Sequence, residues 1–294
     1  MKPTKSIRRQ KNFEGDSEGR MSKFELRNAK LEKPAFRSSQ FRLSTFRKSQ
    51  VKTVTTRTES QNSNFEIRIS NNAPFRIVGV VGDIHCEAGA LKAALTFLTE
   101  ARVDRIFAVG DIVDGEGDVN ECCRLLQEFG VETVSGNHER WFLTGQMRGL
   151  PEVTLRSEVN QQSQAFISGL PPTRAFDTVS GRLLLCHGLG EYDMGGVWPD
   201  DQGYFLESNL ALLRLVSEGE YRFVINGHTH NRMVRRFDDL TIINAGTLYH
   251  DHHPCFLIAD FEEGFVHFFD IQQAARVSKG KIVPLPQAAE RVNH

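Results

Sequence analysis

Five apolar runs of this sequence end in side chains that can bind metals. The runs end in GDIH at 82–85, GDIVDG at 110–115, GNHE at 136–139, CHG at 186–188 and GHTH at 227–230. In open α/β sheets, ligands bind beyond the carboxyl ends of the strands, so distant stretches of chain can converge there. The converging groups are carboxylates, imidazoles and one amide: Asp83, His85, Asp111, Asn137, His138, His187, His228 and His230.

These side chains are ligands for divalent Mn, Fe, Co, Ni or Zn. None of the candidates is a cysteine, which argues against a closed structural zinc site and for an open catalytic one. One ion takes about four to six ligands, so the set fits better to two ions about 3.5–4 Å apart that share a carboxylate. A water that bridged two such ions would lose a proton near neutral pH and could act as a hydrolytic nucleophile. The chemistry that such a pair of ions supports is hydrolysis by an activated water.

The runs that carry these motifs alternate with helical patterns in the first half of the domain. We expect strands over 75–83, 104–111 and 131–137, and helices over 87–101, 118–130 and 155–168. The second half favours short strands at 182–188, 221–230, 232–237, 240–246, 255–261 and 264–270, with one helix over 204–219. The pattern predicts an α/β fold in which two β-sheets pack face to face as a sandwich, flanked by helices.

Composition and length set the class of protein. The chain has 294 residues, of which 39% are apolar and 25% charged, enough for a large core. No stretch approaches the roughly 18 consecutive apolar residues of a membrane span, and the first 30 residues lack the apolar segment of a secretion signal. We therefore expect no membrane contact and a cytoplasmic location. The five cysteines form no CxxC pair and are predicted to be reduced.

Charge divides the chain into two parts. Residues 1–72 carry 17 Lys and Arg against 7 Asp and Glu, whereas residues 73–294 carry 19 against 30. We expect 1–72 to be a basic, disordered extension, with an edge strand near 64–70, and 73–294 to be the folded domain. In the extension, the repeat FRSSQFRLSTFRKSQ interleaves Phe with Arg. We expect a solvated tail or, as the alternative, a weak contact with nucleic acid or an acidic partner. Met21 is an alternative start to Met1.

The ordered set of five motifs resembles the calcineurin-like metallophosphoesterase superfamily. The spacing over 110–139 is similar to that of its small bacterial and archaeal phosphodiesterases. The resemblance implies a four-layer α/β/β/α fold and two divalent metal ions, Mn foremost, with Fe, Zn, Ni or Co as alternatives. It implies one metal on Asp83, His85, Asp111 and His230, and a second on Asp111, Asn137, His187 and His228. His138 would then be the non-ligand residue that stabilises the transition state and protonates the leaving oxygen.

Two positions set the chain apart from the phosphoprotein phosphatases that it otherwise resembles. Their GDxVDRG and RGNHE motifs carry arginines whose guanidinium groups grip a monoester phosphate. Here Gly115 and Ser135 stand at those positions. We therefore expect a phosphodiesterase that acts on a small or nucleotide-derived diester. The sequence is also compatible with a homo-oligomer. A phosphomonoesterase or protein phosphatase of the same fold, and a non-catalytic scaffold, are the alternatives.

Four further features adjoin the motifs. Cys86 stands where many relatives carry Gly, and we expect its side chain to narrow the cleft or to alter the helix start. Arg140 is expected to be either a solvated helix charge or a group that reaches the site. The acidic, Gly-rich residues 189–204 are expected to form a surface connection or a rim, and YHDHHP at 249–254 an exposed turn.

Overall fold

The computed structural model describes residues 73–272 and 275–285. The predicted basic extension over 1–72, with its Phe-Arg repeat, its edge strand and Met21, lies outside the described residues. Within the described ranges, no helix has both the length and the apolar character needed to cross a membrane.

The first sheet joins a parallel part to an antiparallel part. Its order is β11 (Arg276–Pro284), β10 (Phe265–Gln272), β9 (Cys255–Asp260), β1 (Ile77–Val81), β2 (Arg105–Ala108) and β3 (Glu132–Thr133). The strands β1, β2 and β3 run parallel, connected by the helices α2 (Ala88–Glu100) and α3 (Val119–Glu128). The other three strands pair antiparallel, from β9 outward. The carboxyl ends of the parallel strands therefore lie on one edge of the sheet.

The second sheet also places parallel strands at its centre. Its order is β4 (Thr173–Thr178), β5 (Gly181–Cys186), β6 (Phe223–Asn226), β8 (Leu240–Asn244) and β7 (Met233–Phe237). Strand β6 pairs parallel with both β5 and β8, while β4 and β7 pair antiparallel at the edges. The helices α6 (Tyr204–Glu207) and α7 (Leu210–Glu218) lie between β5 and β6 in the chain.

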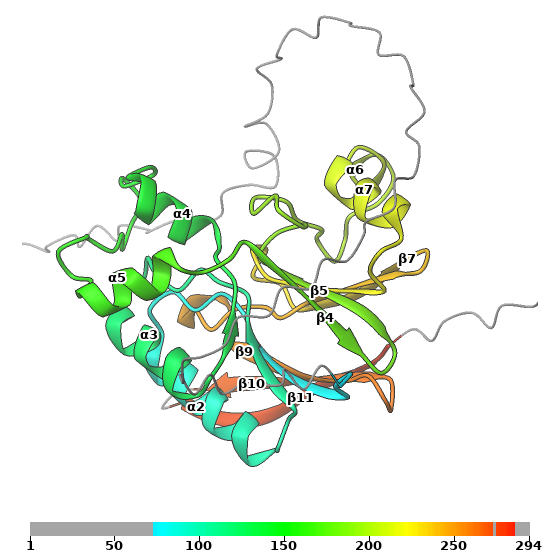
Figure 1. The fold of residues 1–294 in the computed structure, drawn as a ribbon, viewed down its shortest axis with the longest axis horizontal. Helices are drawn as coiled ribbons and strands as arrows, with labels where there is room; N and C mark the ends of the chain where they lie inside the picture. The colour runs from blue at the N-terminus through cyan, green and yellow to red at the C-terminus, as the bar shows by residue number, and fades with distance from the viewer. Residues whose placement is uncertain (1–72, 273–274, 286–294) are drawn as a thin grey trace, which may run out of the picture. The chain divides into compact units, whose positions relative to one another are not determined.

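Alternation along the strands builds three apolar layers. Val80 and Phe107 point into the layer between the sheets and meet Leu183 and Ile225 there. Their strand neighbours, such as Val81, pack against α2 and α3 on one outer face. On the other outer face, residues of β5, β6 and β8 pack against α7. Figure 1 follows this order of helices, sheet, sheet and helices, which confirms the predicted four-layer α/β/β/α fold.

Several predicted elements differ in extent from those observed. The strand predicted over 131–137 is limited to β3, because the chain turns at Gly136 into the helix α4 (Asn137–Thr144). The helix predicted over 155–168 forms only as α5 (Gln161–Ser168), and the one over 204–219 is split into α6 and α7. In both cases an asparagine side chain, Asn160 or Asn209, accepts a hydrogen bond from a backbone N–H and starts a new helix. The strands β4 and β11 were not predicted.

Candidate metal centre

The predicted site residues all follow strand ends of the two sheets. Asp83 and His85 follow β1, Asp111 follows β2, Asn137 and His138 begin α4, His187 follows β5, and His228 and His230 follow β6. These strands are parallel within each sheet, so their carboxyl ends share an edge. The structure brings all eight residues into one network of contacts.

One part of this network joins Asp83, His85 and His230. The Nε2 atoms of the two imidazoles face each other at 3.1 Å. Nε2 of His230 also lies 3.5 Å from Oδ2 of Asp83. This Oδ2 atom is buried and has no hydrogen-bond partner among the described residues. Two imidazole nitrogens and a carboxylate oxygen therefore converge on one point.

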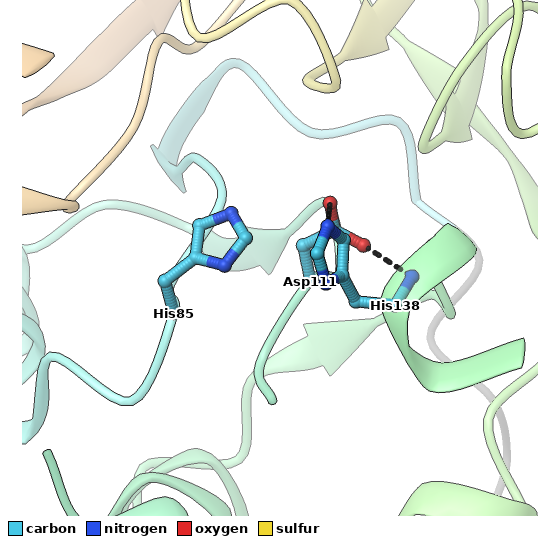
Figure 2. Close-up of side chains that lie close together, drawn as sticks. All are labelled: His85, Asp111 and His138. Carbon is cyan, nitrogen blue, oxygen red and sulfur yellow. Dashed lines mark hydrogen bonds and ion pairs between the residues drawn. The ribbon is translucent and has the colours of Figure 1, made fainter. Parts of the chain in front are cut away.

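The other part joins Asp111, Asn137, His187 and His228. Nε2 of His187 lies 3.1 Å from Oδ2 of Asp111 and 2.9 Å from Oδ1 of Asn137. The same Oδ1 atom lies 3.0 Å from Nδ1 of His228. Asp111 belongs to two groups of three side chains, and within each group the ligand atoms lie within 4.8 Å of one another. One group is His85, Asp111 and His138, and the other is Asp83, Asp111 and His187. Figure 2 shows the Asp111 carboxylate linked to His138, with the His85 ring beside them.

The loops that carry these residues have left-handed backbone conformations. His85, Asp111, His228 and His230 have φ values of 45°, 48°, 67° and 56°. Such conformations are costly for residues with side chains and persist only where the surroundings impose them. Here the backbone N–H groups of Ile84 and His85 both donate to the carbonyl of Asp111, at 2.9 and 2.8 Å. The loops after β1 and β2 thus hold each other in place.

Glu139 organises the loop after β2, a role that the sequence analysis did not assign. Its carboxylate is fully buried and accepts hydrogen bonds from four backbone N–H groups. Oε2 accepts from Asp111 and Gly136 at 2.8 and 2.7 Å, and Oε1 accepts from Ile112 and Val113 at 2.6 and 3.2 Å. The signal was present in the sequence, since a Glu at the third position of a helix commonly caps its start.

Asp114 holds His138 and was also missed. Nδ1 of His138 lies 2.7 Å from Oδ2 of Asp114, so that the opposite ring nitrogen, Nε2, faces Oδ2 of Asp111 at 4.0 Å. Arg148 donates to both oxygens of Asp114, at 3.1 and 2.9 Å. The backbone N–H of Thr154 also donates to this carboxylate, at 2.8 Å. Asp114 is therefore fixed on several sides and fixes His138 in turn.

Burial and charge shift the pKa values of the network in opposite directions. Burial raises the pKa of Asp83 to about 7, although the charge of His187 opposes the shift. For His187, burial disfavours a charge, but the charges of Asp111 and Asp83 and the hydrogen bonds to Asp111 and to the carbonyl of Val109 together raise the pKa to about 10. The pKa of Asp111 stays well below its usual range because His187 and His138 more than offset its burial. In the chain alone, a protonated imidazole thus balances the central carboxylate.

This arrangement fits divalent cations. A cation at the first part of the network would satisfy the unpartnered Oδ2 atom of Asp83 and the two facing imidazole nitrogens. The set of imidazole, carboxylate and amide oxygen matches borderline transition metals. Cβ atoms on Gly136 and Gly227 would come within 2.1 and 2.4 Å of the carboxylates of Asp111 and Asp83. Only glycine fits at these two places.

The prediction that Cys86 narrows the cleft is wrong. Its side chain is buried in a core cluster that includes residues of α2 and α3, and Sγ lies 3.7 Å from Oγ1 of Thr154. Helix α2 begins at Ala88, directly after this turn. Burial raises the pKa of the Cys86 thiol to about 12. All five cysteines are free and buried, as expected for reduced core residues.

Two further segments contact α4 or the centre. Arg140 pairs with Asp193 of the 189–204 segment through two hydrogen bonds of 2.6 and 2.9 Å, so it is not a free solvated charge. The exposed turn expected at 249–254 contains a short 3-10 helix, His250–His252. Its His252 has Nδ1 at 2.7 Å from Nδ1 of His230. The ring of Tyr249 packs edge-on against His85, with 5.6 Å between centroids.

The chain is similar to several known proteins. MJ0912, an uncharacterized protein of Methanocaldococcus jannaschii, is 22% identical over 189 residues, which are 62% of this chain and 74% of the relative. Serine/threonine-protein phosphatase 1 of Salmonella typhimurium is 37% identical over 70 residues, 24% of this chain and 32% of its own length. The crystal structure of the hypothetical protein PH1004 from Pyrococcus horikoshii is 15% identical with a TM-score of 0.48, covering 72% of this chain and 88% of that one.

The family assignment comes from a family model. The family model of the calcineurin-like phosphoesterase superfamily domain matches residues 77–264, which include all five motifs and most strands of both sheets. The chain therefore belongs to the calcineurin-like phosphoesterase superfamily and is a hydrolase that acts on phosphoric ester bonds.

Proposed function

We propose that the centre holds two divalent cations and hydrolyses a phosphodiester. Asp83, His85, Asp111 and His230 would hold one cation. Asp111, Asn137, His187 and His228 would hold the other, with Asp111 shared. The observation that carries the proposal is the position of Asp111, whose carboxylate lies close to members of both proposed sites. It has ligand atoms within 4.8 Å of those of Asp83 and His85, and its Oδ2 lies 3.1 Å from Nε2 of His187.

The protein's own residues prepare the rest of the reaction. When bound, two divalent cations supply a water of lowered pKa and neutralise the charge of the phosphate. His138 stands beside the centre without being needed as a ligand, with Nε2 directed toward it. Nδ1–H of His138 donates to Asp114, which fixes the ring, and in the protonated imidazole the second proton, on Nε2, can pass to the leaving oxygen. His138 is thus the proposed general acid, and Asp114 positions it.

The arginines near the centre support a diester over a monoester. At Gly115, a Cβ atom would lie 2.0 Å from the carbonyl oxygen of His85, so this backbone has no room for the phosphatase arginine. Arg140 is engaged by Asp193, and Arg148 by Asp114. A dianionic monoester gains most from a free guanidinium fork, whereas a monoanionic diester depends on it less. The diester is therefore the substrate that this charge distribution favours.

Some finer points rest on the sequence and the ligand types alone. Manganese is the cation that we expect first, because carboxylate and amide ligands accompany the imidazoles. The cytoplasmic location, the homo-oligomer and the contact of the basic extension with nucleic acid or an acidic partner stay predictions.

The test compares 4-nitrophenyl phosphate with bis(4-nitrophenyl) phosphate, each with Mn²⁺ supplied. We expect a higher kcat/KM for the diester. Asp111→Asn should lower it by about 10³-fold or more, since both cations lose their shared ligand. His138→Ala should lower it by roughly 10²- to 10⁴-fold through loss of the acid. The matched control is Asp177→Asn, at an exposed aspartate of β4. Preference for the monoester, or diester activity that survives Asp111→Asn, would overturn the proposal.

A further inference from the structure

A cavity of about 300 Å³ is lined by residues that lie close in the chain to two of the candidate ligands. Its walls come from α4, from the end of α5 with the residues that follow it, and from the loop after β5. Ser135 lines it two residues before Asn137, and Gly190 lines it three residues after His187. The cavity is thus built from direct continuations of the segments that carry two of the candidate ligands.

Helix geometry determines which side of the centre the cavity adjoins. Successive helical residues are separated by about 100°, so Arg140 projects about 200° away from His138. Asn137, Arg140 and Thr144 have the spacing of one helix face. Arg140 and Thr144 line the cavity. The cavity therefore lies on the Asn137 side of α4, and His138 lies on the opposite side.

This placement separates the two arms of a diester. The proposed general acid, His138, must face the oxygen that leaves. In an in-line displacement the leaving group lies opposite the attacking water, and the retained arm projects sideways. A cavity on the face of α4 away from His138 is therefore suited to the retained arm.

The lining defines the chemistry of that arm. Leu143, Ile167 and Leu170 give the cavity apolar walls. The charges of Arg140 and Asp193 cancel in their ion pair, so the carboxylate of Glu191 leaves a net charge of −1 on the lining. This charge disfavours a second phosphate, whereas a carboxylate accepts hydrogen bonds from hydroxyl or amino groups. Pockets of about this volume hold small organic ligands.

A serine at position 135 is consistent with this use. The phosphoprotein phosphatases carry an arginine there, whereas the short side chain of Ser135 lines the cavity here. The backbone N–H of Ser135 donates to the carbonyl of Pro171 at 2.9 Å, which fixes this part of the wall. The cavity is therefore a preformed feature with a defined rim.

We propose that this cavity binds the retained arm of the diester, and that this arm is an uncharged, hydroxyl-bearing organic group of nucleoside size. The inference rests on the proposed diesterase activity and specifies its substrate class. It also assigns a binding role to the 189–204 segment, whose residues Gly190, Glu191 and Asp193 form one wall.

The test uses two diesters with the same leaving group, 4-nitrophenolate. One is thymidine 5′-(4-nitrophenyl phosphate), whose retained arm is a nucleoside, and the other is methyl 4-nitrophenyl phosphate. We expect the wild-type protein with Mn²⁺ to favour the nucleoside diester by at least tenfold in kcat/KM. Thr144→Trp should fill the cavity and reduce this preference, the ratio of kcat/KM for the two diesters, to below about threefold.

A matched control variant is Ser217→Trp, at an exposed position of α7. Like Thr144, whose hydroxyl donates to the carbonyl of Arg140, Ser217 donates to a backbone carbonyl of its own helix, that of Arg214. This variant should keep the preference for the nucleoside diester. Equal kcat/KM for the two diesters in the wild type, or a preference that survives Thr144→Trp, would overturn the cavity assignment. If neither diester were hydrolysed, the diesterase proposal itself would fail.

Discussion

The metal centre and the segment 249–254 are both rich in histidine, but they differ in burial and support. In the centre, Asp83, Asp111, Asn137 and His187 are at most 2% exposed. Their loops are held by backbone hydrogen bonds and by the carboxylates of Glu139 and Asp114.

The outer segment has the same residue type with less support. It exposes three histidines: His250 and His252 lie on a single turn of 3-10 helix, and His253 caps its end. The difference teaches that residue type alone does not make a site. Burial and a second layer of hydrogen-bond partners fix the donor atoms of the centre. The predictions below remove this support step by step, from the inside outward.

The largest effect is expected from Glu139→Gln. Each carboxylate oxygen accepts two backbone N–H groups, and the amide group of glutamine would turn a donor toward one of these pairs. We expect the free energy of unfolding to fall by about 3 kcal/mol, measured by urea denaturation. Glu128→Gln, at an exposed position of α3 paired with Arg124, is the control and should change it by less than about 1 kcal/mol. Equal stability of the two variants would show that Glu139 does not organise the loop.

The next effect concerns Asp114, which positions His138. In the wild type, the two carboxylate oxygens of Asp114 accept hydrogen bonds from His138, Arg148 and Thr154. Asp114→Asn leaves a single carbonyl oxygen for these donors. We expect kcat for the diester to fall by about tenfold to a hundredfold while KM changes little. Steady-state kinetics measures this, with unfolding curves as the check on structure. An unchanged kcat would remove Asp114 from the positioning of His138.

A smaller effect is expected where the outer segment touches the centre. His252 contacts the outer nitrogen of His230, and a partner of this kind fixes the orientation of a ligating imidazole. His252→Ala should weaken Mn²⁺ binding by about tenfold in isothermal titration calorimetry. His253→Ala, one residue further along, should leave the affinity within about twofold. If both variants bound Mn²⁺ like the wild type, the segment would lie outside the functional centre altogether.

Much of the fold and the candidate ligands could be predicted because both depend on local patterns. Apolar runs that end in Asp, Asn or His identify strands and the edge where they meet. The sequence also indicated that Gly115 and Ser135 replace two arginines. By contrast, the partners of Asp114 come from a separate segment, Arg148 and Thr154, and no local pattern links them.

Two other features depend on tertiary packing. The side chain of Cys86 could have faced the cleft or the core, and only the left-handed turn at φ 60° directs it into the core. The cavity beside α4 forms from three chain segments, so its volume follows from their packing and not from any motif. The helix starts at Asn160 and Asn209 could, however, have been predicted from the sequence, because asparagine is a preferred residue at the N-cap.

The most direct test of the central claim is the number of divalent cations that the centre binds. Metal-stripped wild-type protein should bind two Mn²⁺ ions per chain in isothermal titration calorimetry, and Asp111→Asn should bind fewer. Asp177→Asn, the exposed control, should still bind two. A wild-type stoichiometry of one or none, or two tightly bound ions in Asp111→Asn, would contradict a centre built around a shared Asp111.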